Sequence, residues 1–364
     1  MSNAPVLIMA GGTGGHVFPA LAVARKLIKL NRQVVWLGTQ RGLESRVVPQ
    51  AGIKLECIRV AGLRRKGLLS WLLAPFKICI AVFDALRIVR RLRPDVVLGM
   101  GGFASGPGGL AAWLLGRPLV IHEQNAAAGL TNRLLAGLAR EVLQAFPGSF
   151  NARLKVRTIG NPVRAEIFDL AGPAERLAGR SGPLRILVLG GSQGALALNE
   201  TVPAALGLLE ADIKVDIWHQ SGVSTQQQAL DAYSQQGIKA RVDAFIEDMN
   251  KAYEWADMVV CRSGALTVSE LAAAGLGAIL VPYPSAVDDH QTLNARYLVN
   301  ADAAVIIQQA DLTPAVLAEE LSRCARDRKL VLQRAQNARQ LASPEATLDL
   351  VNACLEQLQE RQAA

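Results

Sequence analysis

Short apolar runs alternate with longer amphipathic stretches along the chain. The apolar runs, which we predict to be β-strands, cover residues 6–9, 33–37, 96–98, 119–121, 186–189, 215–218, 258–261 and 278–281. Strands that alternate with helices form parallel sheets with helices on both faces. The pattern therefore predicts a doubly wound α/β fold, in which ligands bind beyond the carboxyl ends of the strands.

Two of these strands run into glycine-rich turns of similar sequence. The strand at 6–9 is followed by Gly-Gly-Thr-Gly-Gly-His, and the strand at 186–189 by Gly-Gly-Ser-Gln-Gly, so that Gly11 and Gly190 correspond. Glycine lets a ligand approach backbone N–H groups closely, and the helix that we expect after each turn adds the positive end of its dipole. We therefore predict two similar domains, each with an anion-binding turn.

The length of the chain also indicates two domains. Its 364 residues exceed the roughly 250–300 at which a single hydrophobic core stops growing. Turn-forming residues gather at 160–164 and 172–183. We place the boundary near residue 162, with domains at 1–162 and 163–343 and a terminal helix at 344–364.

Composition and charge narrow the classes of protein. Hydrophobic residues make up 51% and charged residues 19% of the chain, which is typical of globular proteins. The net charge of +8 suits nucleic acid, an anionic membrane or a phosphorylated substrate, and the total alone does not choose among them. The five cysteines form no Cys-x-x-Cys pair, and the N-terminal stretch lacks the basic region of a secretion signal. We expect a reducing, cytosolic compartment and no zinc site.

The segment 96–116 carries no charged residue and is long enough to suggest a membrane span. It contains seven glycines and a proline, which favour a strand, a glycine loop and a buried helix instead. Its Gly99-x-Gly101-x-x-Ala104 is similar to a dinucleotide-binding fingerprint, so a nicotinamide-dependent oxidoreductase is one alternative function. Because Pro107 and the adjacent glycines should prevent the tight helix start of that fingerprint, we interpret the loop as a glycine floor facing the first turn.

His16 closes the first glycine turn at the carboxyl end of a strand. A neutral imidazole there can take a proton from an attacking hydroxyl, a role typically worth about 10²–10⁴ in rate. The turn lacks the Gly-Lys-Ser/Thr ending of a P-loop, so nucleoside triphosphate hydrolysis is not expected. Glu123, Gln124 and Asn125 follow the strand at 119–121 and reach the same region, where Asn125 suits either a sugar hydroxyl or a turn cap.

Residues of the second half suit a nucleotide diphosphate. Ser192, in the Gly190 turn, can bind phosphate or cap a helix. Residues 259–270 form a strand, a small-residue turn and a helix start, where Glu270 can bind the hydroxyls of a ribose or favour the dipole as a first-turn acid. No Asp-x-Asp occurs in the chain, so we expect no metal and assign the leaving-group charge to loop N–H groups and Arg164.

Basic residues concentrate between Leu63 and Arg93, where Asp84 is the one acidic residue. Apolar residues lie among them at helical spacing, including Trp71, Leu72, Phe76, Ile80 and Phe83. Such a helix fits an anionic bilayer surface, at about 1 kcal/mol per nearby cation, or an ordinary core helix with solvated arginines. Nucleic acid is disfavoured, because the aromatic residues lie among aliphatic ones rather than on an exposed basic sheet.

Six ordered segments carry the most specific information. They are Ala-Gly-Gly-Thr-Gly-Gly-His-Val-Phe-Pro at 10–19, Gly-Met-Gly-Gly-Phe-Ala-Ser-Gly-Pro-Gly-Gly at 99–109, His-Glu-Gln-Asn at 122–125, Gly-Asn-Pro-Val-Arg at 160–164, Gly-Gly-Ser-Gln-Gly at 190–194 and Cys-Arg-Ser-Gly-Ala-Leu-Thr-Val-Ser-Glu at 261–270. Together they closely resemble the MurG family of bacterial N-acetylglucosaminyltransferases, over nearly the whole chain. The resemblance implies a GT-B fold, with two Rossmann-like domains facing each other across a cleft. The N-terminal domain would hold a lipid acceptor at the membrane, with helix 344–364 packed back on it, and the C-terminal domain the donor.

The resemblance also implies an activity. It is the inverting transfer of N-acetylglucosamine from UDP-N-acetylglucosamine to the C4 hydroxyl of undecaprenyl-diphospho-N-acetylmuramoyl-pentapeptide (lipid I), which gives lipid II for peptidoglycan synthesis and needs no cofactor. The implied location is peripheral, at the cytoplasmic face of the inner membrane, with roles in cell shape and division and with cell-wall and division proteins as partners. A related glycosyltransferase with a different acceptor is the alternative. We take His16 as the catalytic base and Glu123 as the second candidate.

The contacts of the donor follow from the same resemblance. They are Thr13, Gly14, Gly15, Asn125, Arg164, Ser192, Ile246, Ala265, Leu266, Thr267, Val268, Ser269, Glu270 and Gln291. Within this set, Ile246 would present its backbone to uracil and Glu270 would bind the ribose. After Pro282 the chain reads Tyr-Pro-Ser-Ala-Val-Asp-Asp-His-Gln, where relatives often show paired glutamines. The choice between Gln291 and His290 as the sugar contact therefore stays open.

Overall fold

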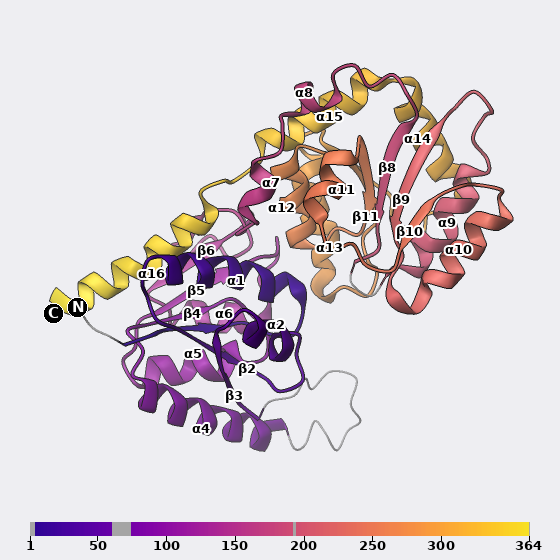
Figure 1. Ribbon diagram of the computed structural model, residues 1–364. Coiled ribbons are helices and arrows are strands. Elements are labelled where there is room, and N and C mark those ends of the chain that lie inside the picture. The colour runs from indigo at the N-terminus through magenta and orange to yellow at the C-terminus, as the bar shows by residue number, and fades with distance from the viewer. Residues whose placement is uncertain (1–3, 60–73, 192–193, 364) are drawn as a thin grey trace. The chain divides into compact units, whose positions relative to one another are not determined.

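The computed structural model describes residues 4–59, 74–191 and 194–363 (Figure 1). The chain divides into two compact units, one made of Met1–Val163 and Glu345–Ala364 and the other of Arg164–Pro344. Each unit is built around a parallel sheet with helices on both faces. The predicted doubly wound α/β class is confirmed.

The first unit has a seven-stranded sheet in the order β3-β2-β1-β4-β5-β6-β7. Its elements are β1 (Val6–Met9), α1 (Gly14–Lys29), β2 (Val34–Gly38), α2 (Glu44–Gln50), β3 (Lys54–Cys57), α4 (Ala74–Leu92), β4 (Val96–Gly99), α5 (Ser105–Leu114), β5 (Leu119–Glu123), α6 (Leu130–Ala136), β6 (Glu141–Gln144), β7 (Arg157–Thr158) and α16 (Ala346–Ala363).

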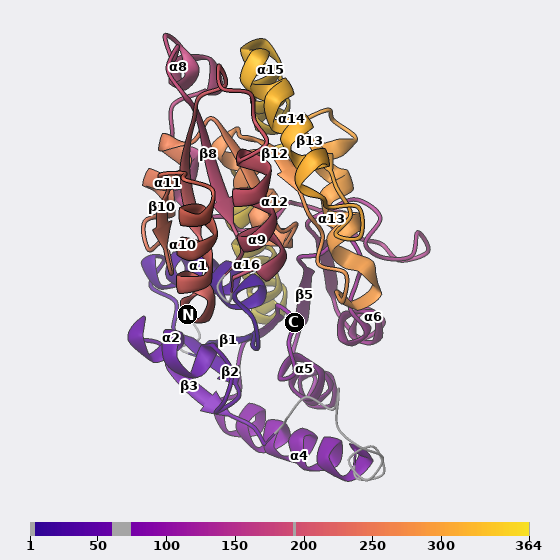
Figure 2. The same ribbon diagram turned by 90° about the vertical axis from the view of Figure 1, so that its right-hand side faces the viewer.

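Alternate residues of β1 enter two separate hydrophobic cores, one on each face of this sheet. Val6 and Ile8 pack in a cluster with residues of α1 and α16, whereas Leu7 and Met9 pack in a cluster with residues of α4, α5 and α6. Figure 2 shows α4 and α5 side by side. Because side chains alternate across a strand, a strand buried on both faces is apolar at every position, as the run Val-Leu-Ile-Met of β1 is.

The second unit has a six-stranded sheet in the order β10-β9-β8-β11-β12-β13. Its elements are α7 (Ala165–Phe168), α8 (Pro173–Leu177), β8 (Leu184–Leu189), α9 (Leu196–Leu206), β9 (Val215–Gln220), η1 (Val223–Thr225), α10 (Gln226–Gln235), β10 (Arg241–Asp243), α11 (Met249–Trp255), β11 (Met258–Cys261), α12 (Ala265–Ala274), β12 (Gly277–Leu280), η2 (Val287–Asp289), α13 (His290–Val299), β13 (Ala304–Ile306), α14 (Pro314–Arg326) and α15 (Arg328–Gln340).

All eight predicted strands are present, with ends that differ by one or two residues at most. Five further strands, β3, β6, β7, β10 and β13, were not predicted. Of these, β3 and β7 are the edges of the first sheet, and β10 and β13 are the edges of the second. Edge strands are often short and carry polar residues, so a sequence such as Lys-Leu-Glu-Cys in β3 has no apolar run to reveal it.

The charge-free segment 96–116 forms β4, a glycine loop and α5, as predicted. Helix α5 begins at Ser105, after Gly101 and Gly102 with positive φ, and holds Pro107 in its first turn. The helix thus starts beyond Gly99-x-Gly101-x-x-Ala104 and not within it, as the dinucleotide fingerprint would require. Proline is tolerated in a first turn because the N–H groups there have no helical partner. Among the helices of the described ranges, none combines the length and apolarity needed to cross a bilayer.

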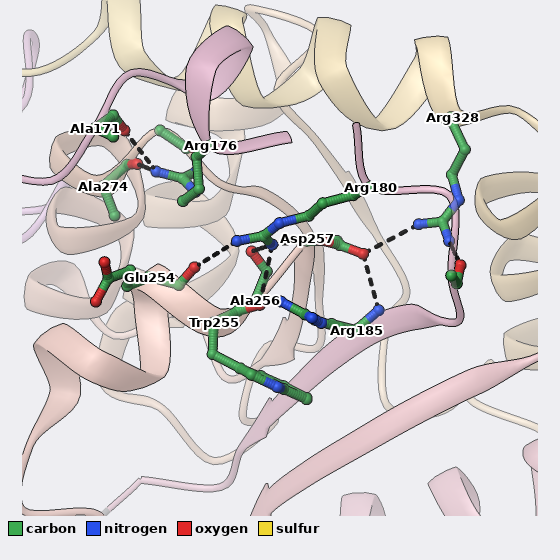
Figure 3. A network of polar contacts seen from close by, with 12 residues as sticks. Ala171, Arg176, Arg180, Arg185, Glu254, Trp255, Ala256, Asp257, Ala274 and Arg328 are labelled. Carbon is green, nitrogen blue, oxygen red and sulfur yellow. Dashed lines mark hydrogen bonds and ion pairs between the residues drawn. The ribbon is translucent and has the colours of Figure 1, made fainter. Parts of the chain in front are cut away.

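A buried carboxylate, Asp257, ties together three parts of the second unit (Figure 3). It accepts hydrogen bonds from Arg180 Nη1 at 2.6 Å, from Arg328 Nη1 at 3.1 Å and from the backbone N–H of Arg185 at 3.0 Å. Arg180 precedes β8, Arg185 lies in β8 and Arg328 begins α15. An unpaired charge at such a buried position would be strongly destabilising. The network therefore fixes the N-terminal ends of β8 and α15, and the segment before β8, around one residue.

We predict that Asp257→Asn lowers the free energy of unfolding of the second unit by about 3 kcal/mol, because the arginines then lose their buried counter-charge. Urea unfolding followed by tryptophan fluorescence measures the change, with Trp218 and Trp255 as probes in this unit. Asp212→Asn is the matched control, since exposed Asp212 lies 4.0 Å from Arg326 in a surface pair worth about 0–1 kcal/mol. Equal effects of the two substitutions would contradict the assignment.

Candidate active site

Both sheets reverse their strand order at one point. In the first sheet β1 lies between β2 and β4, and in the second β8 lies between β9 and β11. Ligands of doubly wound folds bind outside the carboxyl ends of the strands at such a switch point. Turn 11–16 follows β1 and loop 99–104 follows β4, while turns 190–194 and 262–264 follow β8 and β11. All four sequence-predicted loops therefore lie at the two switch points.

The first glycine turn (residues 11–16) leads directly into α1. Gly12 has a φ of 90°, which favours glycine, and Thr13 occupies the N-cap of α1. The first turn of this helix contains Gly14, Gly15 and the half-buried His16. Their position at a helix N-terminus supports the predicted preference for an anionic ligand.

The second glycine loop (residues 99–104) lies against the first. A β-carbon added to Gly102 would collide with the Gly11 carbonyl, and one added to Gly101 would lie 2.8 Å from the imidazole Nδ1 of His16. Both glycines also have positive φ values, 89° for Gly101 and 85° for Gly102. The prediction of a glycine floor that faces the first turn is confirmed, and the close approach needs glycine at these positions.

Glu44 supports the first glycine turn, although the sequence did not identify it. Its fully buried carboxylate accepts the Gly12 N–H at 2.9 Å, and from Thr39 it accepts the backbone N–H at 3.0 Å and the hydroxyl at 2.7 Å. A β-carbon on Gly11 would lie 2.6 Å from the same carboxylate. Nothing in the local sequence marks Glu44, because its partner Gly12 is 32 residues away.

His16 is the end of a chain of side-chain hydrogen bonds. Its Nδ1 lies 2.8 Å from Gln124 Oε1, and Gln124 Nε2 lies 3.1 Å from Nδ1 of His122. The other ring nitrogen of His122 lies 2.9 Å from the Gly160 carbonyl oxygen. Burial lowers the pKa of His122 to about 4, so His122 is neutral at physiological pH. Gln124 is also buried, whereas His16, at the end of the hydrogen-bonded chain, is half-buried.

Glu123, the second candidate base, is engaged by the loop that follows β5. Glu123 is 2% exposed. Its carboxylate accepts the backbone and side-chain N–H groups of Asn125 at 3.0 and 3.1 Å, the Gly129 N–H at 3.1 Å and an N–H of Asn132 Nδ2 at 2.8 Å. Asn125 thus takes part in the local turn, as one of its two predicted roles requires. Four donors around one buried carboxylate indicate a structural role for Glu123.

In the second unit, Gln220 connects the Gly190 turn to Ile246. The side chain of Gln220 donates to the Gly191 carbonyl at 3.0 Å and accepts the backbone N–H of Ile246 at 2.9 Å. Because the N–H of Ile246 is taken by Gln220, the carbonyl oxygen of Ile246 is the backbone group that can bind a nucleobase. The turn has positive φ at Gly191 and Gly194, whereas Ser192 lies outside the described residues.

Helix α12 begins at the switch point of the second sheet. The first hydrogen bond at its N-terminus joins the Val268 N–H to the Gly264 carbonyl, so the amides of residues 265–267 point out of the helix end. The predicted contacts Ala265, Leu266, Thr267, Val268, Ser269 and Glu270 form the first six residues of this helix. The alternative reading of Glu270 as a first-turn acid is wrong, because it lies in the second turn, beyond the main effect of the dipole.

Glu270 is held between two partners. Its side chain accepts the hydroxyl of Tyr253 at 2.8 Å and Arg164 Nη2 at 3.2 Å. Burial raises the pKa of Glu270, and the opposing effect of Arg164 and the Tyr253 hydrogen bond does not cancel it. Arg164 and Glu270, which the sequence assigned to separate groups of a ligand, therefore form one ion pair. Tyr253 was not predicted.

The loop before α13 positions Gln291. Its Oε1 accepts the Tyr283 N–H at 2.9 Å, which directs the amide nitrogen away from that contact. Asp288 and Asp289 precede the helix with left-handed φ values of 52° and 49°, a conformation that aspartate tolerates better than most residues. His290 starts α13. Both candidates for the sugar contact thus lie in the first turn of one helix.

Helix α4 presents an apolar face to solvent on its outer side. Phe76 and Phe83 are 68% and 57% exposed, and Ile80, between them at helical spacing, is half-buried. The guanidinium of Arg87 lies 5.7 Å from the Phe83 ring. The core-facing residues are Ala81, Ala85, Ile88 and Val89. A helix that only packs against the core with one face would not expose two phenylalanines on the other. Two residues of the predicted patch, Trp71 and Leu72, lie outside the described residues.

The described residues contain no group of three or more His, Cys, Asp and Glu side chains arranged to hold a metal ion.

Matches to known families cover both halves of the chain. Residues 6–144 match the glycosyltransferase family 28 N-terminal domain, and residues 185–360 match the glycosyltransferase family 28 C-terminal domain. These matches give no support to the alternative of a nicotinamide-dependent oxidoreductase.

Proteins that match this chain over nearly their full length share one name, UDP-N-acetylglucosamine--N-acetylmuramyl-(pentapeptide) pyrophosphoryl-undecaprenol N-acetylglucosamine transferase. The protein of this name from Marinobacter nauticus is 55% identical over 350 residues, which are 96% of each chain. The one from Alkalilimnicola ehrlichii is 56% identical over 353 residues, which are 97% of this chain and 99% of the relative.

Solved structures agree with these matches. The crystal structure of Acinetobacter baumannii MurG is 42% identical, with a TM-score of 0.85, and the match covers 97% of this chain and 99% of that one. A calicheamicin glycosyltransferase shares the fold at 17% identity and a TM-score of 0.66, over 98% and 100% of the two chains. The fold is thus the GT-B fold of two-domain glycosyltransferases. By full-length identity, family match and structural similarity together, the chain belongs to glycosyltransferase family 28 and, within it, to the MurG family.

Proposed function

We propose that this protein transfers N-acetylglucosamine from UDP-N-acetylglucosamine to the C4 hydroxyl of lipid I, which gives lipid II. The observation that carries the proposal is identity above 50% over nearly the whole length of relatives named for this transfer. The protein would act in peptidoglycan synthesis. A different acceptor remains the alternative that the experiment below separates.

The second unit would bind the donor. The carbonyl of Ile246 suits the imide N–H of uracil, and the ionised Glu270 accepts hydrogen bonds from the paired hydroxyls of ribose. The amides at the N-terminus of α12 and the Gly190 turn, with Ser192, would hold the diphosphate. Arg164 donates one N–H to Glu270, and its other donors stay available for phosphate oxygens. Gln291 or His290 would contact the sugar.

The first unit would bind the acceptor and supply the base. The oxygen of the C4 hydroxyl attacks the anomeric carbon, its proton passes to Nε2 of His16, and the bond between the anomeric carbon and the phosphate oxygen of UDP breaks, so that the anomeric configuration inverts. His16 suits this role better than Glu123, because the Glu123 carboxylate is buried and already accepts four hydrogen bonds. Thr13, Gly14 and Gly15 would contact the departing UDP with backbone N–H groups at the start of α1.

We also propose a peripheral location at the cytoplasmic face of the inner membrane. The exposed face of α4, with Phe76, Ile80 and Phe83 beside Arg87, suits an anionic bilayer surface that contains the lipid acceptor. The surrounding basic residues would add electrostatic attraction that depends on salt. Partners among cell-wall and division proteins stay a prediction from the family resemblance.

The first prediction from the proposed function concerns transfer and its base. The protein should transfer labelled N-acetylglucosamine from UDP to a lipid I analogue, both with and without a metal chelator. His16→Ala should lower kcat by about 10²–10⁴ because proton removal from the hydroxyl is lost, while the dissociation constant of UDP changes little. Steady-state kinetics at saturating substrates measures the effect. Near wild-type turnover of His16→Ala would remove the base assignment, and transfer to other acceptors in preference to lipid I would favour the alternative function.

The second prediction concerns Glu270. Glu270→Gln should weaken UDP binding by about 10-fold or more, because a charged acceptor for two hydroxyls is lost. Protonation removes the charge of Glu270 and turns one of its oxygens into a donor, and its pKa is raised by burial. UDP affinity should therefore fall with decreasing pH already above the ordinary glutamate pKa of 4.5. Isothermal titration calorimetry across pH measures both effects. Glu200→Gln, a solvent-exposed glutamate of α9, is the control, and an unchanged pH profile in Glu270→Gln would contradict the role.

The third prediction concerns the outer face of α4. Phe76→Glu combined with Phe83→Glu should weaken binding to vesicles of anionic lipid roughly 100-fold, since burial of a phenylalanine is worth about 1.5–3 kcal/mol. Vesicle sedimentation measures the effect. The matched control is Leu208→Glu, which changes an exposed apolar residue of the second unit. Equal losses in the control, or none in the double variant, would exclude α4 as the membrane-binding surface.

A further inference from the structure

The hydrogen bonds that end at His16 begin at two backbone carbonyl groups. One is the carbonyl of Gly160, 2.9 Å from Nε2 of His122, and the other is the carbonyl of His122 itself, 3.2 Å from Nε2 of Gln124. A backbone carbonyl can only accept a hydrogen bond. The direction of each bond in the chain is therefore determined from these two fixed ends.

The Gly160 carbonyl determines the tautomer of His122. Nε2 of His122 must carry the hydrogen that this carbonyl accepts, and the buried ring is neutral, with a pKa of about 4. A neutral imidazole has one N–H only. Nδ1 of His122 is consequently an acceptor.

Two acceptors then determine the orientation of the Gln124 amide. Nδ1 of His122 lies 3.1 Å away and the His122 carbonyl 3.2 Å away from the same end of the amide. That end must be the NH₂ group, because the amide oxygen would face two acceptors without a hydrogen. Gln124 Oε1 therefore points to His16, at 2.8 Å from its Nδ1.

We propose that His122 and Gln124 are positioning residues that hold neutral His16 in the tautomer with hydrogen on Nδ1. Since Gln124 Oε1 can only accept, Nδ1 of His16 donates to it and Nε2 carries the lone pair. In the part of the chain that the structure describes, Nε2 makes no hydrogen bond to protein. The ring thus presents its basic nitrogen outward, ready to take a proton.

This inference deepens the proposed function, since the tautomer matters for transfer only if His16 is the base. The arrangement is that of a catalytic histidine in which a hydrogen-bond partner holds the ring nitrogen that does not take the proton. Here the partner is the neutral amide of Gln124 in place of the usual carboxylate. A neutral partner orients the ring without adding a negative charge beside it. Gly101 contributes space, because a side chain there would meet the His16 ring.

Nitrogen-15 NMR of protein labelled at histidine tests the tautomers directly. The chain contains four histidines, so single substitutions assign every ring signal. At a pH where the rings are neutral, we expect His16 to be protonated at Nδ1 and His122 at Nε2. A His16 ring protonated at Nε2 in the wild-type protein would overturn the inference, and this measurement needs no variant to fold.

Gln124→Leu tests the effect on catalysis. Loss of the amide should move part of the His16 population to the Nε2–H tautomer and lower kcat by about 10- to 100-fold, with KM for UDP-N-acetylglucosamine unchanged. His219→Phe is the matched control. His219 belongs to the second unit, is as buried as His122 and pairs with the Tyr233 hydroxyl at 2.9 Å. It should leave the His16 signals as they are. Unchanged His16 signals in Gln124→Leu would contradict the positioning role.

The two proposals fail in different ways. If His16→Ala keeps its turnover while the wild-type spectrum shows hydrogen on Nδ1, the base assignment is wrong and the tautomer assignment stands. If His16→Ala is inactive and the spectrum shows hydrogen on Nε2, the base assignment stands and the positioning role is wrong.

Discussion

The backbone contact between the two glycine loops of the first unit determines the position of His16. Gly102 lies against the carbonyl of Gly11, and Gly101 lies against the imidazole ring. Such an approach of main chain to main chain requires the absence of two β-carbons and positive φ at both residues. It brings the loops after β1 and β4 together at the switch point of the sheet, where Gln124, from the end of the adjacent β5, can reach the ring.

Buried polar side chains give the loops at both switch points their rigidity. Glu44 fixes the first glycine turn, Glu123 fixes the loop after β5, and Gln220 joins the Gly190 turn to Ile246. Each of these groups accepts backbone N–H groups that would otherwise be unsatisfied in a loop. The loops therefore keep their amides and carbonyls in fixed directions before a ligand arrives, which reduces the entropy lost on binding.

The sequence was sufficient for the loops and for every inner strand except β6, but not for the contacts that hold them. Inner strands such as β1 are buried on both faces and are apolar throughout, so the pattern revealed them, whereas the polar edge strand β3 left no such signal. The glycine turns were visible because few residues accept their conformation. The pairing of Glu44 with Gly12 and that of Arg164 with Glu270 join residues 32 and 106 positions apart, and no local pattern encodes such pairs.

The position of α16 in the first unit affects the order in which the chain can fold during synthesis. Leu350, Cys354 and Leu358 of this helix belong to the same core as Val6 and Ile8 of β1. The second unit, in contrast, is continuous from Arg164 to Pro344. A ribosome therefore releases every residue of the second unit before the last helix of the first, although domains near the N-terminus usually complete their folding earlier. The part of the first sheet that α16 covers, over β4 and β5, therefore stays uncovered until α16 has been made.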